Sequence, residues 1–244
     1  MFNFFINRMK INNNNNNIYF SSLRCPVKPF KIKTQKGCLY CSEIDYKKDY
    51  DNDFYKSIGE FYLDIFANTS SHPFWEKCRK PNIDKHTYRN YVNSEIDEYK
   101  KRFKDDDSTV LLVKDSRGKI VGGIYARVLD INYVLKDDKT LYIDSLAITP
   151  EYQKQNIGKV LLGKILKASK DRFSEVFLVA YKEAENFYKK FKFTKMNKDD
   201  PNQVFAISEL ARERIDYPDY AVFMQRDLGK KSSDKWYDRI KHLK

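Results

Sequence analysis

Apolar residues recur along this chain with two different periods, and their order predicts which segments are helices and which are strands. A spacing of three to four residues over about 52–67 and 84–104 predicts two amphipathic helices, and the same spacing predicts further helices over about 157–171 and 183–191. Short apolar runs between polar turns predict strands, and these cover 38–44, 110–113, 120–129, 141–148, 175–181, 191–196 and 220–228. The order β-α-α-β-β-β-α-β-α-β-β predicts an α/β fold, with a mixed central sheet flanked by helices on both faces.

The segment 141–162 carries the strongest functional signal. It reads as a buried strand, LYIDSLAI, then a polar turn, TPEYQKQN, and then the start of a helix. The first N–H groups of a helix lack partners within the helix, and the helix dipole adds positive potential at the same end. With Lys154 and Lys159 nearby, this turn is suited to bind an anion such as phosphate.

Length and composition predict one globular domain with extensions. The chain has 244 residues, of which 41% are hydrophobic and 15% aromatic. It contains no apolar run of the roughly 18 residues that a membrane helix requires. The net charge is +12, but residues 1–42 hold seven basic and no acidic residues. More than half of the excess charge therefore lies in that leader, and nucleic-acid binding by the domain is only a weak inference.

The two ends of the chain differ from the middle. Residues 1–36 are basic, lack acidic residues and include six consecutive Asn residues at 12–17. This composition fits an organelle transit peptide or, alternatively, a disordered low-complexity tail. We therefore predict a leader over 1–36, a domain over 38–228 and a basic tail over 229–244. The expected location is intracellular, either cytoplasmic or organellar.

The chain has four cysteines, and their spacing does not complete a metal site. Cys38 and Cys41 form a single C-x-x-C pair, which is half of a typical zinc site, and no second pair or spaced His pair completes it. Reduced thiols are favoured over a redox pair, and no metal is expected.

Two motifs resemble the GCN5-related N-acetyltransferase (GNAT) superfamily. The family signature R/Q-x-x-G-x-G/A reads here Gln153-x-x-Asn156-x-Gly158, with Asn in place of the first Gly. A second signature, A-x-x-x-Y-x-x-x-G-F, reads Ala184-x-x-x-Tyr188-x-x-x-Lys192-Phe193, with Lys in place of Gly. The predicted element order over about 38–228 is also similar to that of the family, whose sheet is mixed and mostly antiparallel.

The resemblance implies acetyl-CoA as cosubstrate. Its pantetheine arm would pair with the backbone at Leu146, Ala147 and Ile148, where the strand separates from its neighbour. Its pyrophosphate would lie on the N–H groups of the turn and the helix start, formed by Gln153, Lys154, Gln155, Asn156, Ile157, Gly158 and Lys159.

A weaker resemblance is to the arylalkylamine N-acetyltransferase-like branch. It rests on Ser71-His72-Pro73-Phe74 after the first predicted helix and on 216–220 near the last strand. His72 would stand where some members carry a Glu that is proposed as general base. The ordinary alternative for His72 is a surface residue.

Acetyl transfer to an amine needs a base, a polarised carbonyl and an acid for the leaving thiolate. Tyr188 is the candidate acid, and the alternative is packing against its helical neighbours. Tyr142 and Asp144 are two apart on a strand and so share a face, which makes them candidates for a base or a water relay; a structural, hydrogen-bonded Asp144 is the alternative. The sequence thus favours an N-acetyltransferase acting on a small-molecule or peptide amine. The alternatives are a catalytically silent acyl-CoA-binding sensor and, less favoured, a nucleic-acid-associated protein.

Overall fold

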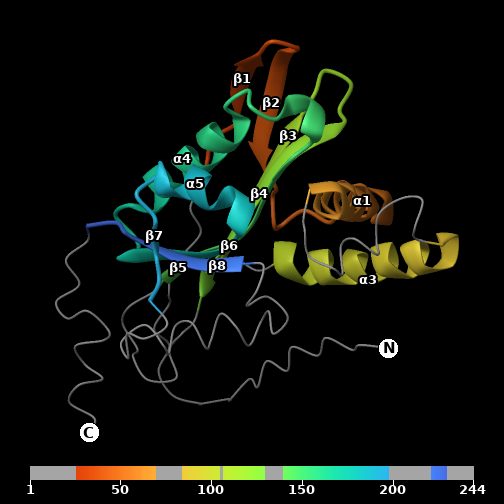
Figure 1. Cartoon of the computed structure of the whole chain (residues 1–244). Helices are drawn as coiled ribbons and strands as arrows, with labels where there is room; N and C mark the ends of the chain where they lie inside the picture. The colour runs from red at the N-terminus through yellow and green to blue at the C-terminus, as the bar shows by residue number, and fades with distance from the viewer. Residues whose placement is uncertain (1–25, 70–83, 105–106, 130–139, 198–220, 230–244) are drawn as a thin grey trace, which may run out of the picture.

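The computed structural model describes residues 26–69, 84–104, 107–129, 140–197 and 221–229 (Figure 1). Its strands form one sheet in the order β1-β2-β3-β4-β5-β6-β8-β7. The strands are β1 (Phe30–Thr34), β2 (Gly37–Glu43), β3 (Ser108–Lys114), β4 (Ile120–Leu129), β5 (Thr140–Ile148), β6 (Glu175–Tyr181), β7 (Thr194–Lys195) and β8 (Ala221–Asp227). Neighbouring strands are antiparallel except β5 and β6, which are parallel. The prediction of a mixed, mostly antiparallel sheet is confirmed.

Helices cover both faces of this sheet, as predicted. They are α1 (Asn52–Thr69), α3 (Lys85–Phe103), α4 (Ile157–Ser169) and α5 (Glu185–Lys189), with short 3-10 turns η1 (Pro150–Tyr152) and η2 (Lys182–Ala184). Figure 1 shows α1 and α3 side by side on one face, and α4 and α5 on the other. Asp84 caps α3 by accepting hydrogen bonds from the N–H groups of His86 and Thr87, which fixes where this helix begins.

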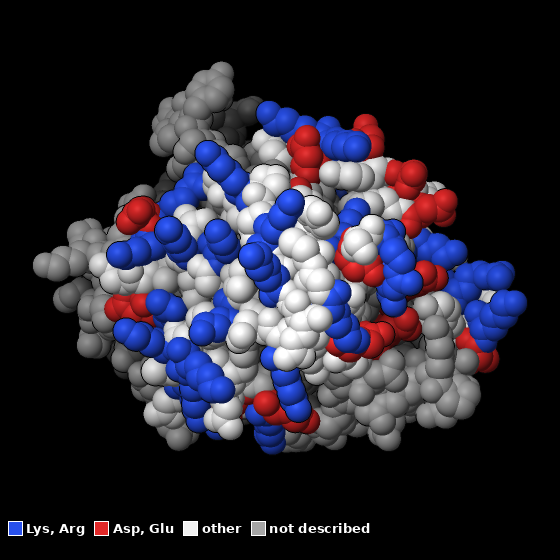
Figure 2. All heavy atoms as spheres, turned by 90° about the horizontal axis from the view of Figure 1, so that it is seen from above, with Lys and Arg blue, Asp and Glu red and all other residues white. Residues whose placement is uncertain are grey.

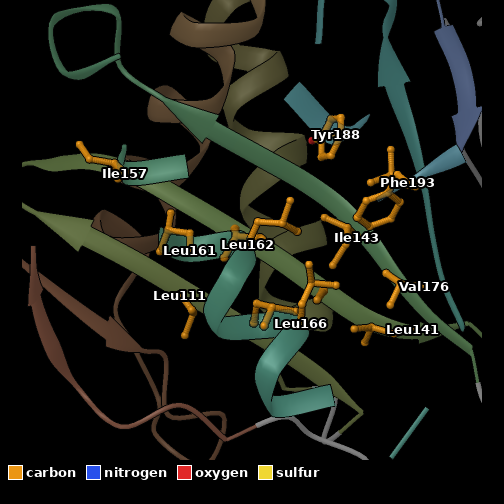
Figure 3. Packing of buried hydrophobic residues seen from close by; sticks show 14 of the residues in the cluster. Leu111, Leu141, Ile143, Ile157, Leu161, Leu162, Leu166, Val176, Tyr188 and Phe193 are labelled. Carbon is orange, nitrogen blue, oxygen red and sulfur yellow. The ribbon is translucent and has the colours of Figure 1, made fainter. Parts of the chain in front are cut away.

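Strict alternation along β3 separates the two hydrophobic cores. Leu111 and Val113 pack in the core under α4, whereas Val110 and Leu112 pack in the core under α1 and α3. Successive side chains of a strand point to opposite faces, so a fully apolar strand is what a sheet covered on both sides requires. Figure 3 shows the apolar residues of α4 lying against the strand that carries Leu141 and Ile143.

The structure corrects two sequence expectations. The sheet begins at Phe30, inside the segment predicted as a leader, because β1 pairs along its length with β2. The burial of Ile32 in the core explains why this short basic segment is a strand. The helix predicted over 183–191 is instead η2 followed by the five-residue α5. Residues 1–25, and with them most of the predicted leader, lie outside the described residues.

The C-x-x-C pair lies on β2 with its two thiols in different surroundings. Cys38 is exposed and Cys41 is buried, as expected for residues an odd number of positions apart on a strand. Burial raises the pKa of the Cys41 thiol to about 12, although Lys164 opposes the shift. This placement fits two independent reduced thiols. Within the described residues, no helix combines the length and apolar composition that crossing a membrane requires.

Candidate functional site

The sheet opens between β5 and β6. The two strands pair only over Leu141–Ile143 and Val176–Leu178, although β5 continues to Ile148 and β6 to Tyr181. On its other edge β5 stays paired with β4 as far as Ile148. Backbone groups of 144–148 that face away from β4 therefore meet no strand of the described sheet. The separation predicted near Leu146 begins earlier, directly after Ile143.

A bulge in β5 marks the start of this opening. Ser145 lies opposite Tyr125, and Ile143 lies opposite the next residue, Ala126, so Asp144 is an extra residue in the ladder. A bulge bends a strand and redirects the side chains beside it. Here Asp144 interacts with Arg102 of α3, and Ser145 interacts with Tyr62 of α1, so both side chains lie on the α1/α3 face.

Asp144 is held by two arginines. Its carboxylate lies 3.4 Å from Arg102 Nη1 and 3.9 Å from Arg127 Nε, and its side chain is 7% exposed. Arg102 also binds Glu98 through a 2.7 Å contact between Nε and Oε1. Burial lowers the pKa of Arg102, but Asp144, Tyr125 and Glu98 raise it more. A carboxylate paired with two guanidinium groups is a weak base, so this geometry favours the structural alternative for Asp144.

Tyr188 and Tyr142 lie close enough to interact electrostatically. Burial raises the pKa of the Tyr188 phenol, and Tyr142 raises it further. Tyr188 is therefore protonated at neutral pH, as a proton donor must be. It also packs edge-on against Phe187 and Phe193, so the packing alternative holds together with the candidate role. The guanidinium of Arg127 lies 5.1 Å from the centre of the buried Tyr142 ring.

The turn between β5 and α4 has the shape of an anion site. Lys154 and Asn156 both have positive φ, at 60° and 64°. Gln153 Nε2 donates to Ile148 O at 3.1 Å, which ties the turn to the end of β5. The first N–H donated within α4 is that of Val160, to Asn156 O at 2.9 Å. The N–H groups of the preceding residues of the helix have no partner within the described part of the helix and can bind an anion.

Side chains around this turn divide between solvent and core. Gln153, Lys154, Asn156 and Lys159 are exposed, whereas Gln155 and Gly158 are half-buried. Ile157 is buried in the core, so its contribution to an anion site is its backbone N–H. On β5, Ala147 is buried under α1, and Leu146 and Ile148 pack against the core under α4.

Both departures from the family's glycines fall on left-handed backbone. Asn156 has φ 64° and Lys192 has φ 62°. Asn enters this region more readily than other non-Gly residues, whereas Lys is strained there. The backbone at both positions therefore has the conformation that glycine would adopt. The turn after α5 still places the buried Phe193 against Tyr188.

Positive charge extends well beyond the anion turn. Residues 153–195 carry eleven Lys and Arg against four Asp and Glu. In Figure 2, Lys and Arg spread over the left part of the upper face, the side of α4 and α5 in Figure 1, and most acidic residues lie to the right. Exposed lysines of α4 include Lys159, Lys164 and Lys167. Outside the leader, basic residues are therefore concentrated in this segment.

Sequence reasoning missed the residues that surround Asp144 on the α1/α3 face. Tyr62 and Arg102 occupy ordinary positions of amphipathic helices, and Ser145 is a small residue in an apolar strand. The signal that was present is the Gly122-Gly123 pair. A Cβ at Gly122 would lie 2.9 Å from Ile148 Cδ1, and one at Gly123 would lie 3.0 Å from Tyr62 Oη, on opposite faces of β4.

Some predicted residues lie outside the described part of the chain. These are His72, the remainder of the 71–74 motif and the 216–220 motif. The proposed role of His72 and the likeness to the arylalkylamine N-acetyltransferase-like branch therefore stay predictions.

Comparison with known proteins agrees with this geometry. Residues 80–193 match the model of the acetyltransferase (GNAT) family. No curated protein matches the sequence. The GNAT domain of S. lividans PAT has a similar fold, with a TM-score of 0.50 and 10% identity over 82% of this chain and 96% of that one.

Two further solved structures match at lower TM-scores. A predicted acetyltransferase of Clostridium acetobutylicum, solved with acetyl-CoA, has a TM-score of 0.48 and 18% identity over 66% of this chain and 92% of that one. PaiA N-acetyltransferase of Thermoplasma acidophilum, solved with coenzyme A, has a TM-score of 0.44 and 16% identity over 77% of this chain and 98% of that one.

Proposed function

We propose that this protein transfers the acetyl group of acetyl-CoA directly to a primary amine, and the match of residues 80–193 to the acetyltransferase (GNAT) family model supports this. The observation that carries the proposal is the opening between β5 and β6 beside the N-terminus of α4. An extended thioester arm fits along an unpaired strand edge, and a pyrophosphate fits the free N–H groups at the adjoining helix start.

The proposed binding mode uses the backbone more than side chains. The pyrophosphate lies on the N–H groups of Ile157, Gly158 and Lys159, and exposed Lys154 adds charge beside it. The pantetheine arm pairs with the edge of 145–148 that faces away from β4 and meets no described strand. A backbone N–H near the bulge then donates to the thioester carbonyl, so that charge developing on its oxygen is stabilised.

In the proposed reaction the amine nitrogen attacks the carbonyl carbon and the C–S bond breaks. Tyr188 gives its proton to the leaving thiolate; its raised pKa and its place in one core cluster with residues of β5 and β6 support this role. His72 is retained as the proposed base that takes the proton of the amine. Asp144, engaged with Arg102 and Arg127, is assigned to holding the bulge rather than to proton transfer.

The alternative is a catalytically silent protein that binds acyl-CoA. This alternative is suggested by the replacement of two family glycines by Asn156 and Lys192. Both residues adopt the left-handed backbone that glycine would supply. The cofactor turn and the turn behind Tyr188 are therefore retained, which favours the enzyme.

The function is tested on the full chain by following release of the CoA thiol with phenylethylamine, spermidine and a peptide with a free N-terminal amine, alongside calorimetric titration of acetyl-CoA. We expect amine-dependent release that falls at least tenfold in Tyr188→Phe, by an order-of-magnitude estimate for losing a general acid. Tyr55→Phe is the matched control, since Tyr55 is buried in the core under α1 and α3. Tight binding without release on any amine would favour the silent protein.

The anion turn is tested separately with Gly158→Leu. A Cβ at Gly158 would lie 3.5 Å from Phe187 Cζ, an ordinary contact, so the backbone can keep its fold. The rest of a Leu side chain would crowd the N–H groups of the helix start, and acetyl-CoA affinity should fall. Gly163→Leu is the matched control, because nothing lies within 4 Å of a Cβ at Gly163 of the same helix. Equal affinities in the two variants would refute the phosphate assignment.

A further inference from the structure

Tyr62 places a phenol hydroxyl deep under the opening of the sheet. Its ring is stacked between Phe66 and Tyr99, with centroids 5.8 Å away in each case. Its hydroxyl oxygen is buried and, among the residues that the structure describes, completes no hydrogen bond of ordinary geometry. A buried hydroxyl without a partner costs free energy, and such groups recur where a ligand or a catalytic step completes the bond.

The backbone of β4 is shaped to admit this hydroxyl. A Cβ at Gly123 would lie 3.0 Å from Tyr62 Oη and 3.3 Å from Leu112 Cδ2. Any larger residue would displace the phenol or the strand. The position of the Tyr62 hydroxyl is therefore defined by the helix that carries it and by the glycine of the strand it touches.

Ser145 is the residue that connects Tyr62 to the opening. It follows the bulge of β5, is half-buried, and belongs to the segment that no longer pairs with β6. Its hydroxyl interacts with the Tyr62 phenol closely enough to affect its pKa, but not at the geometry of a normal hydrogen bond.

We propose that Ser145 contacts the acceptor amine and that Tyr62 is a positioning residue that holds the Ser145 hydroxyl toward it. The proposal rests on the proposed function. The amine donates an N–H to Ser145 Oγ, Ser145 donates its O–H to Tyr62 Oη, and the nitrogen lone pair is left aimed at the thioester carbon. No covalent bond to either side chain forms.

The charges around Tyr62 and Ser145 keep both hydroxyl groups neutral. Burial raises the pKa of Tyr62; Ser145 and Arg102 oppose this, and Asp144 adds to it. The phenol therefore stays uncharged at neutral pH. The neighbouring carboxylate, Asp144, is occupied by Arg102 and Arg127. The acceptor is thus received by hydroxyl groups, and the site suits the uncharged amine that can attack.

The test compares Tyr62→Phe, Ser145→Ala and the double variant in the full chain, using the amine on which the wild type is most active. Each single change should lower kcat/KM for the amine about fivefold to tenfold, the effect of one lost hydrogen bond. The double variant should be no worse than the poorer single variant, because the two hydroxyls act in series. Acetyl-CoA affinity, measured by calorimetry, should stay within twofold of the wild type.

Two further variants distinguish positioning from simple packing. Tyr99→Phe removes a hydroxyl from the ring stacked on Tyr62 and should leave kcat/KM unchanged. Ser145→Thr keeps the hydroxyl and should retain most of the activity. Losses that multiply in the double variant, a parallel loss of acetyl-CoA affinity, or an equal effect of Tyr99→Phe would overturn the proposal. Absence of turnover in the wild type would instead refute the proposed function and this inference with it.

Discussion

The left-handed turn after α5 offers a direct test of how this chain tolerates a missing glycine. Lys192 is exposed and has φ 62°. Its N–H donates to Lys189 O at 2.9 Å, and the next N–H, of Phe193, donates to Tyr188 O at 3.3 Å. The turn thus ends α5 and directs Phe193 into the core beside Tyr188. Lys192→Gly changes the conformational preference without removing either backbone bond.

The expected gain follows from two opposing terms. A residue other than Gly in the left-handed region costs about 1–2 kcal/mol. Glycine also loses more backbone freedom on folding than lysine does, and this lowers the gain in stability by about 0.4–1 kcal/mol. The free energy of unfolding should therefore rise by about 0.5–1 kcal/mol in Lys192→Gly. For a chain of this size, that corresponds to an increase in Tm of roughly 1–4 °C.

Lys190→Gly is the matched control. Lys190 is also exposed, lies two positions earlier, and has ordinary right-handed angles, φ −63° and ψ −20°. Gly there relieves no strain and should lower the free energy of unfolding by about 0.5–1 kcal/mol. Urea unfolding of both variants measures the difference, expected near 1.5 kcal/mol. If the two variants lose stability equally, the strain assigned to Lys192 is not present.

Three other predictions concern the site. Gly123→Ala should lower the free energy of unfolding by about 1–3 kcal/mol, because its methyl group meets Tyr62 Oη at 3.0 Å; an unchanged urea midpoint would contradict this contact. Asp144→Asn removes the buried carboxylate that Arg102 and Arg127 share, leaving Arg102 paired with Glu98 alone, and should cost about 2 kcal/mol in the same assay. A loss under about 0.5 kcal/mol would mean that the Asp144 pairs are solvated. Because the pKa of Tyr188 is raised from 10.0, the acid form persists to higher pH, and kcat should show no alkaline loss from this group below about pH 10. An alkaline limb near pH 8 that disappears in Tyr188→Phe would refute its role as the acid.

Much of the fold was readable from periodicity. The pattern located α1, α3, α4 and the strands β2 to β6 and β8 to within a few residues, because each of these segments buries a continuous apolar face. It failed at β1, where Ile32 is the buried residue of a five-residue strand and the surrounding lysines resemble a leader. It also overextended α5, because periodicity does not reveal a turn with positive φ at a lysine.

Part of the candidate site was likewise predicted from the sequence, and part was not. The turn at 153–159 and Tyr188 were found because they are contiguous motifs with fixed spacing. The surroundings of Asp144 were not found, since Arg102 is 42 residues away in the chain and becomes its partner only when α3 packs on the sheet. Two-residue spacing placed Tyr142 and Asp144 on one face, but it did not reveal that a bulge would add Ser145 to that face.

The sequence alone therefore determined the local properties of this protein: which segments are apolar on one side, where a strand runs through a polar turn into a helix, and which residues stand where glycine is usual. These follow from short-range chemistry, which needs only neighbours along the chain. The tertiary structure decided where β5 separates from β6, which guanidinium groups meet Asp144 and where the Tyr62 hydroxyl lies. Each of these depends on the register between strands and on helices packing across the sheet, and residues distant in sequence are brought together only by that packing.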